Sequence, residues 1–188
     1  MSLSTALNRA NAVVSFFSSV FFGVLAVVAV TGPMLLYSSA RPEVNVGLAK
    51  ASVKVGRLGY YHNPKHPTTE IATVHFDLNA DLSPLFNWNT KQLFVFLVAE
   101  YSTPSHAHNQ VTLWDDIITT KEESNIKLKR KKAEYALSDI DNKIGGFDAN
   151  LTLHWDIMPW VGVLIHDHSE PTKIKIPEVP PAKKSSTK

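Results

Sequence analysis

A long uncharged apolar segment near the amino terminus constrains this chain more than any other feature. From Val13 to Leu36, 17 of 24 residues are apolar and none is charged. Its unbroken part, Val13 to Val30, would be roughly 27 Å long as a helix, which is close to the thickness of a bilayer's hydrocarbon core. Because its phenylalanines cover more than one helix face, we exclude a helix buried in a soluble core.

A cleaved signal peptide is the alternative interpretation, since Ser38 and Ala40 supply the small residues of a cleavage pattern. The segment is longer than the apolar region of roughly 7–15 residues that such peptides carry, so we favour an uncleaved signal anchor. Thr31, Gly32 and Pro33 are expected to kink or end the helix near one membrane interface.

These boundaries divide the chain into four parts. We predict an amino-terminal segment (1–11), a transmembrane signal anchor (12–36), a folded body (37–176) and a flexible tail (177–188) rich in proline, lysine and serine. Positive charges counted on the two sides of the anchor would place the body in the cytosol. This positive-inside rule is less reliable when a long domain follows the anchor, so the charges alone do not decide the orientation.

The charged residues restrict the function of the body. All 17 acids and 18 of the 19 bases follow residue 40, which gives the body a net charge of about +1. A net charge this small gives no strong positive electrostatic potential with which to bind nucleic acid. The chain has no cysteine, so disulfides, thiolate metal sites and thiol nucleophiles are excluded.

Strand patterns dominate the body. Apolar and polar residues alternate over 74–80 and 151–157, which is typical of half-buried strands, and the apolar run Leu93–Ala99 predicts a central strand covered on both faces. Further strands are expected around 44–55, 111–117, 126–137 and 173–176. With no convincing amphipathic helix between them, we predict a single amino-terminal transmembrane α-helix followed by a mostly antiparallel β-sandwich. The basic run Lys127–Lys132 is interpreted as an edge strand.

Histidine is the residue type that most suggests chemistry. Two H-x-H pairs and one H-x-x-x-H could supply zinc ligands, together with a further histidine: His106 and His108, His166 and His168, His62 and His66, and His154. Both H-x-H pairs lie in polar, turn-rich segments, and their spacing matches no known zinc pattern. We therefore interpret them as solvated loop histidines.

No catalytic group is expected. The chain contains the residue types of a serine triad, for example Ser102, His154 and Asp115. It has no G-x-S-x-G sequence to support such a triad. No glycine-rich phosphate loop is present. The sequence therefore predicts no catalytic residue, no metal and no cofactor.

Aromatic residues beside polar ones form the candidate partner interface, or its immediate support. Tryptophan and tyrosine combine a large apolar area with a hydrogen-bonding tip, which suits a protein contact. The candidates are Trp88, Asn89, Glu100, Tyr101, Asn109, Gln110, Trp114 and Asp115. Asn150 begins the single N-x-S/T sequon of the chain and is a candidate glycosylation site.

These residues also carry a family resemblance. The matching segments are Arg9–Asn11, Ala80–Leu82, Leu85–Phe86, Trp88–Asn89, Lys91–Phe94, Ala99–Tyr101, Asn109–Val111, Leu113–Asp115, Ile117–Ile118, Asn150–Leu153, Trp155, Met158–Pro159 and Gly162. In this order and spacing the chain resembles subunit 3 of the eukaryotic signal peptidase complex over residues 9–162. Residues 60–70, 126–146 and those after 162 depart from the pattern.

The resemblance implies a type II protein of the endoplasmic reticulum membrane, with a short cytosolic amino end and a lumenal β-sandwich. It implies a non-catalytic scaffold role beside the serine-protease subunit that removes signal peptides, with the other small membrane subunits as further partners. It also implies a glycan at Asn150. A membrane-tethered binding module, for example for carbohydrate, and a metallohydrolase using the H-x-H pairs remain the alternatives.

Overall fold

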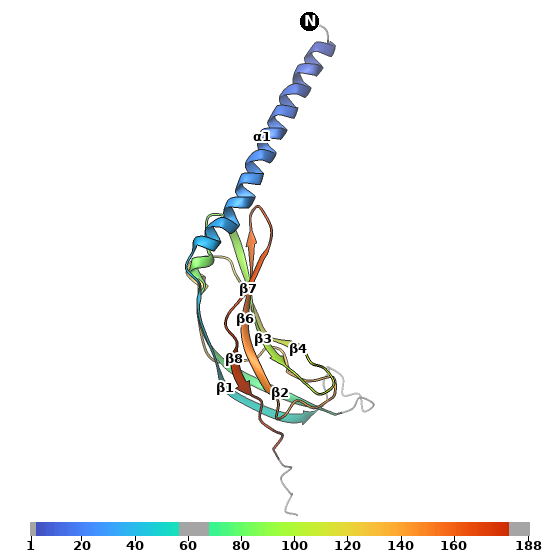
Figure 1. Cartoon of the computed structure of the whole chain (residues 1–188), viewed down its shortest axis with the longest axis vertical. Helices are drawn as coiled ribbons and strands as arrows, with labels where there is room; N and C mark the ends of the chain where they lie inside the picture. The colour runs from blue at the N-terminus through green and yellow to red at the C-terminus, as the bar shows by residue number, and fades with distance from the viewer. Residues whose placement is uncertain (1–2, 57–67, 181–188) are drawn as a thin grey trace, which may run out of the picture.

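The computed structural model describes residues 3–56 and 68–180, which form one long helix and two antiparallel sheets packed face to face (Figure 1). The elements are α1 (Leu3–Ser38), β1 (Glu43–Gly56), β2 (Thr69–Asp81), η1 (Ser83–Leu85), β3 (Thr90–Tyr101), β4 (Asn109–Ile118), η2 (Glu122–Ser124), β5 (Asn125–Lys132), β6 (Asp148–Pro159), β7 (Ile165–His168) and β8 (Thr172–Lys175). The predicted fold class, a transmembrane-type helix before a mostly antiparallel β-sandwich, is confirmed.

The two sheets differ in size. The smaller sheet has the order β1-β2-β5, so the basic strand β5 lies at an edge, as the sequence predicted. The larger sheet has the order β4-β3-β6, and β6 then pairs with β7 near one end and with β8 near the other. Strand β3 is thus central, as predicted for Leu93–Ala99.

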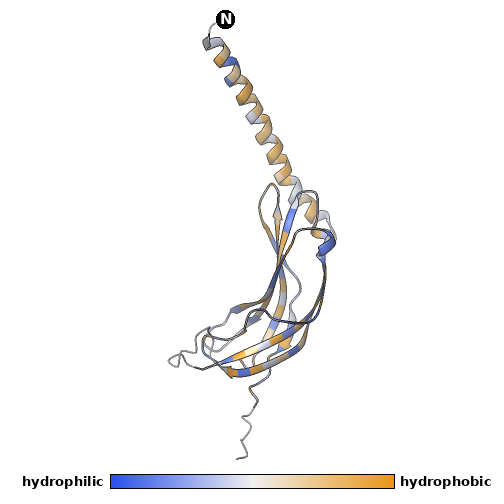
Figure 2. Cartoon of the chain, turned by 180° about the vertical axis from the view of Figure 1, so that it is seen from behind, coloured by the Kyte–Doolittle hydropathy of each residue, from blue (hydrophilic) through white to orange (hydrophobic). Residues whose placement is uncertain are grey.

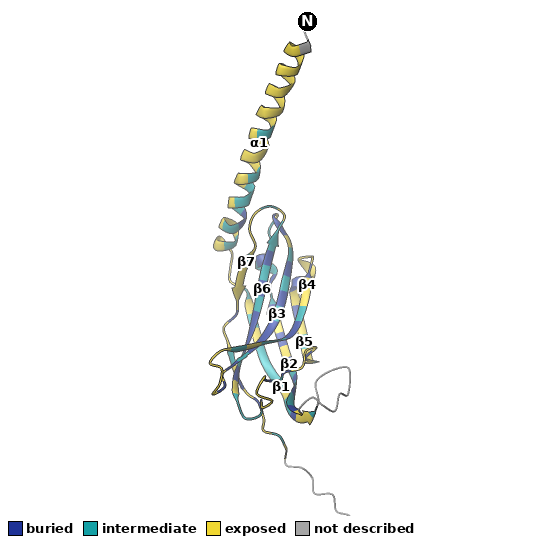
Figure 3. Ribbon diagram, turned by 90° about the vertical axis from the view of Figure 1, so that its right-hand side faces the viewer, coloured by how far each residue is buried: buried dark blue, intermediate teal, exposed yellow. Residues whose placement is uncertain are grey.

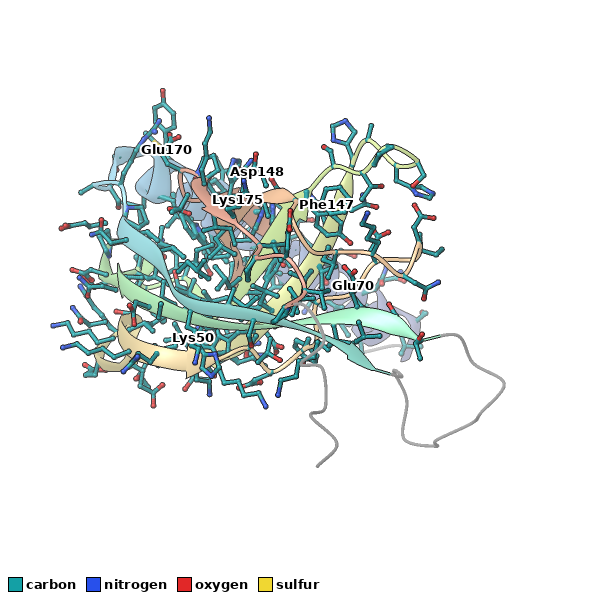
Figure 4. The ribbon with its side chains drawn as sticks, turned by 90° about the horizontal axis from the view of Figure 1, so that it is seen from below. Lys50, Glu70, Phe147, Asp148, Glu170 and Lys175 are labelled. Atoms are coloured by element: carbon teal, nitrogen blue, oxygen red, sulfur yellow. The ribbon has the colours of Figure 1, made fainter. Side chains whose placement is uncertain are left out.

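The core lies between the sheets. The alternating residues predicted to point inward are almost fully buried: Val74, Phe76, Leu78 and Ala80 on β2, and Leu151, Leu153, Trp155 and Ile157 on β6. Across the core the Phe76 and Trp114 rings lie 6.1 Å apart. Figure 4 looks along the long axis and separates the two layers, with Lys50 and Glu70 on the smaller sheet and Asp148 and Lys175 on the larger.

Helix α1 extends well beyond the sandwich. Within the described residues, α1 is the one helix that is long and apolar enough to cross a membrane. Most of its surface is exposed and hydrophobic (Figures 2 and 3). Thr31, Gly32 and Pro33 do not end it, because the helix continues through Pro33 to Ser38. Its last turns pack against the sandwich, where Gly32 is buried.

Two local predictions are wrong. The segment around His166 and His168 is strand β7, because it completes the edge of the larger sheet by pairing with residues 154–157 of β6. The apolar run Leu93–Ala99 is not covered on both faces. Phe94 and Phe96 point away from the core, and they are half-buried by neighbouring side chains on the same face.

Some predictions lie outside the described residues or on their border. His62 and His66 fall in 57–67, and most of the predicted tail falls in 181–188, so neither is described. Within the described start of the tail, Val179 packs against the core.

Polar contacts close the end of the sandwich far from α1. The Glu70 carboxylate accepts backbone N–H groups of Ile144 and Gly145 at 2.9 and 2.8 Å, which joins β2 to the segment before β6. The Tyr101 hydroxyl donates to the carboxylate of Asp139 at 3.0 Å, and both residues are buried. Burial, followed by this hydrogen bond, raises the pKa of Tyr101.

The buried tyrosine–aspartate contact predicts a difference between two similar substitutions. Tyr101→Phe should lower the free energy of unfolding by about 1.5–3 kcal/mol, because the buried Asp139 carboxylate loses the donor to its Oδ1 atom and keeps only the Asp141 N–H on the other oxygen. Tyr135→Phe removes a comparable bond to Asp115, 2.7 Å long but exposed, and should cost less than about 0.5 kcal/mol. Urea unfolding of the full chain in detergent measures both, and equal losses would contradict the assignment.

Candidate partner interface

The candidate interface begins where α1 meets the sandwich. We call this contact the joint; it is formed by Gly32 of α1, by Asn89 before β3 and by Val161 after β6. The Asn89 side chain, only 2 % exposed, donates to the carbonyl of Val161 at 2.8 Å and accepts the Val161 N–H at 3.1 Å. Its backbone carbonyl accepts the Trp160 N–H at 2.8 Å. These bonds tie the start of β3 to the β6–β7 connection across 72 residues of sequence.

Two glycines allow the sandwich to pack closely against the helix at this joint. A Cβ atom at Gly32 would lie 2.7 Å from the Asn89 side-chain nitrogen, so only glycine fits there without a shift. A Cβ atom at Gly162 would lie 3.4 Å from the carbonyl oxygen of Ala29, and the φ of +127° at Gly162 also favours glycine. Pro33 has no N–H to offer the Ala29 carbonyl, so Gly162 packs where the helical hydrogen bond is missing.

The larger sheet presents a partly uncovered face on the side away from the core. We define the outer β3–β6 face by the outward residues of its two central strands: Phe94, Phe96 and Glu100 on β3, and Asn150, His154 and Asp156 on β6. Ile117, 54 % exposed, lies beside Phe94 on β4. This face begins at the joint and continues to Glu100 and Asn150, although the outward pair Val98 and Thr152 is buried.

Stacked rings cover part of this face. The rings of Phe94 and Phe96 lie 5.2 Å apart, and Phe96 stacks on His154 at 5.2 Å. His154 in turn lies 5.4 Å from the rings of both His166 and His168 on β7. The prediction of solvated loop histidines is therefore wrong for His166 and His168 in that they lie on a strand, although both are exposed, whereas His106 and His108 do lie in an exposed loop.

The histidine stack favours a neutral ring at its centre. Burial, followed by the charges of His166 and His168, lowers the pKa of His154, and this outweighs the opposing effect of Glu100 and Asp156. His166 bonds to the Asp156 carboxylate at 2.7 Å, whereas the Nε2 atom of His154 is buried without a hydrogen-bond partner. The stack therefore packs as an apolar surface when neutral and repels itself when protonated.

The candidate interface residues fall into three groups. Asn89, Tyr101 and Trp114 are buried, at 2, 6 and 3 % exposure, so they support the surface from within. Glu100, Asn109, Gln110 and Asp115 are partly or fully exposed on β3 and β4, and Gln110 donates to Glu100 at 2.9 Å. Trp88 is 61 % exposed and lies beside the joint.

The sequence analysis missed Phe94, Phe96 and Ile117 as surface residues. Phe94 and Phe96 lie in an apolar run that resembles a fully buried strand, and periodicity alone cannot tell which strand lacks a covering layer. Ile117 could have been found, since it alternates with the buried Ile118 at the end of a predicted strand.

The three residues of the hypothetical triad are not brought together. Asp115 and His154 lie in one row of the sheet with Phe96 between them, which separates the strands that carry them by about 10 Å. Asp115 accepts from Tyr135, and the Ser102 hydroxyl donates to the carbonyl of Ala107 in a loop. Within residues 3–56 and 68–180, no three histidine or acidic side chains gather as a metal site requires.

Asn150 lies at the end of the outer face far from α1. It pairs with Glu100 in the sheet and borders a hollow of about 1080 Å³ whose polar lining includes Gln110, Asn109 and Lys173. Its side chain is partly exposed, while Thr152, the third residue of the sequon, is 2 % exposed and its hydroxyl has no hydrogen-bond partner. The hollow leaves room for a group attached to Asn150.

Comparison with known proteins bears on this site. The profile of a family described as signal peptidase subunit matches residues 3–179. Signal peptidase complex subunit 3 of Yarrowia lipolytica is 37 % identical over 185 residues, which is 94 % of this chain and all of the relative. The human protein of that name is 34 % identical, over 86 % of this chain and 87 % of its own. The protein from Saccharomyces cerevisiae is 40 % identical over 65 % of this chain and 67 % of its own.

The histidine stack predicts that acid weakens the sandwich. Since the pKa of His154 is lower in the folded protein than its ordinary value of 6.5, the unfolded chain binds the proton more readily. The free energy of unfolding should therefore fall as the pH drops below 6.5, and it should fall less in His154→Phe, which keeps the stacking but cannot be protonated. The free energy of unfolding of each protein is compared with its own value at pH 8, so that a difference in packing between histidine and phenylalanine cancels. Equal losses in both proteins would contradict this role of His154.

Proposed function

This chain belongs to the signal peptidase subunit family, and on that premise we propose that it is a non-catalytic accessory subunit of the signal peptidase complex. In this proposal it supports the serine-protease subunit that cleaves signal peptides at the endoplasmic reticulum membrane. It does so by holding a contact surface at a fixed height above the bilayer.

One observation supports the proposal most directly. The half of the outer β3–β6 face nearest α1 carries apolar and aromatic side chains beside Asp115 and Asp156, yet it has no covering layer within the described residues. Phe94, Phe96 and Ile117 lie there, and Ile117 is 54 % exposed. Such a patch beside polar groups is typical of a protein contact. The separation of Ser102, His154 and Asp115 is in keeping with a subunit that contributes no chemical step.

We further propose that the body lies in the lumen, as a single-pass type II protein, and that Asn150 carries a glycan. Asn150 lies nine residues from Pro159 along β6, about 30 Å from the joint with the helix. A glycan there would occupy the hollow and leave the half of the face nearest α1 free. The far end of the face would then be covered by the glycan, and the near end would be available to a partner. The hollow is also the place where a binding module for carbohydrate would hold its ligand.

Glycosylation can be tested with a matched pair of substitutions at one position. Thr152→Ala destroys the sequon and Thr152→Ser keeps it. Both lose the same methyl group, and the hydroxyl that only Thr152→Ala loses makes no hydrogen bond. In microsomes, the wild type and Thr152→Ser should shift in mobility on deglycosylation, whereas Thr152→Ala should not. A wild-type chain that never shifts, and whose body is digested by protease added from the cytosolic side, would overturn the lumenal orientation.

The contact surface can be tested with exposed strand residues of similar size. Ile117→Asp should weaken co-purification with the catalytic subunit, since loss of an interface anchor costs about 2–4 kcal/mol, roughly 30-fold to 1000-fold in affinity. Val55→Asp, on β1 of the other sheet and 58 % exposed, is the control and should co-purify normally. Resistance of both bodies to mild proteolysis establishes that they are folded. Normal recovery of a folded Ile117→Asp chain would argue against this surface.

A further inference from the structure

The connection between β6 and β7 reaches the depth of the membrane boundary. We define the β6–β7 tip as residues 160–164, and its Gly162 packs against Ala29 of α1. Figure 1 shows this hairpin rising beside the lower end of the helix. The contact fixes the height of the tip relative to any bilayer that α1 crosses.

The sequence of α1 sets where that bilayer ends. A span needs about 20 residues and must leave Arg9 and Asn11 outside the hydrocarbon core, so the earliest possible span ends near Thr31. Ala29 then lies inside the boundary by about 3 Å. A tilted helix, or one that enters later, moves the boundary toward Ser38 and leaves the tip deeper. In every arrangement Gly162 is at the boundary or within it.

The side chains of the tip suit this depth. Trp160, Val163 and Leu164 are 67, 69 and 53 % exposed, and residues 157–165 carry no charge. Of the four tryptophans, Trp88 and Trp160 are exposed, and both lie at the end of the sandwich next to α1. Tryptophan concentrates at membrane interfaces because its ring is apolar and its N–H is polar.

The first two residues of the tip have backbone partners in the protein itself. Asn89 pairs with the N–H of Trp160 and with both the N–H and the carbonyl of Val161. A loop that only touched water would not need such partners, whereas unpaired backbone groups are costly in a lipid environment. Asn89 thus lowers the cost of placing the start of this turn at membrane depth.

A basic residue marks the polar side of the tip. The Lys91 ammonium lies 5.5 Å from the centroid of the Trp160 ring, and Lys91 is exposed. A lysine beside an interfacial tryptophan can extend its amine to lipid phosphates while its stem lies along apolar surface. Charge and apolar area are therefore arranged in the order in which a leaflet presents phosphate and acyl chain.

We propose that the β6–β7 tip inserts into the leaflet on the side of the sandwich, as a second membrane contact beside α1. Val163 and Leu164 enter the boundary of the acyl chains, while Trp160 and Lys91 lie at the level of the headgroups. The occupant of this surface is lipid. The inference requires only that α1 crosses the bilayer, so it stands or fails independently of the proposed role in signal peptide cleavage.

The chain has no cysteine, so single-cysteine labelling needs no background substitutions. The probe is an environment-sensitive fluorophore on Val163→Cys, with the purified full chain reconstituted alone into phosphatidylcholine vesicles. The control is Ile140→Cys, which is 77 % exposed and neighbours Asp139, the partner of Tyr101 at the far end of β3. Leu164→Cys provides a second tip position should the first variant fail to fold.

Labels on the tip should be quenched by nitroxide-bearing lipids, and their quenching by aqueous iodide should be about threefold or more weaker than at Ile140→Cys. Equal iodide quenching at Val163, Leu164 and Ile140 would overturn the proposal. Protection of the tip that arises only when other subunits of the complex are added would also overturn it, because the tip would then be a protein contact.

Discussion

The structure depends on the buried amide of Asn89. Its nitrogen and oxygen bind the β6–β7 tip, and its side chain lies against the helix where Gly32 leaves room. No other side chain of similar shape can both donate and accept in this way, since aspartate lacks the donor and leucine lacks both groups. A single buried residue therefore joins three parts of the chain, namely α1, the start of β3 and the end of β6.

Two long paired strands connect this joint to the far end of the sandwich. Strands β3 and β6 pair from Thr90 and Pro159, at the joint, to Tyr101 and Ala149 at the far end. At about 3.3 Å per residue, Phe94 lies about 13 Å from the joint and Asn150 about 30 Å from it. The register of one strand pair thus sets the height of each outward side chain. Fixed heights are useful to a protein that meets its partners at a membrane.

Sequence patterns predicted the strands well where one face was apolar. The alternation over 74–80 and 151–157 identified β2 and β6 because a buried face imposes period two on its residues. Strand β7 was missed because its outward positions are His166 and His168, whose polarity resembles a loop. Their stacking on His154 depends on pairing across 12 residues, which no local pattern reveals.

The burial of the candidate interface residues was not predictable from the sequence, for a physical reason. Large aromatic residues with polar neighbours suit a protein contact and a buried support equally, so composition could not separate Trp88 from Trp114. Burial decides between them, since Trp114 packs on Phe76 across the core while Trp88 is exposed. The outer position of Phe94 and Phe96 follows from the absence of a third layer within the described residues, and only the assembled sheets show it.

The size of the outer face limits what it can do alone. From Thr90 to Phe96 the half nearest α1 is about 20 Å long and four strands wide, or roughly 400 Å² of mixed apolar and polar surface. A stable protein contact usually buries about 800 Å² on each partner. The proposed contact therefore needs a second surface at a compatible height, and the exposed apolar sides of α1 offer one. A partner that also crosses the membrane could bind both surfaces at once. Binding the second would then be intramolecular, which raises overall affinity without any stronger local contact.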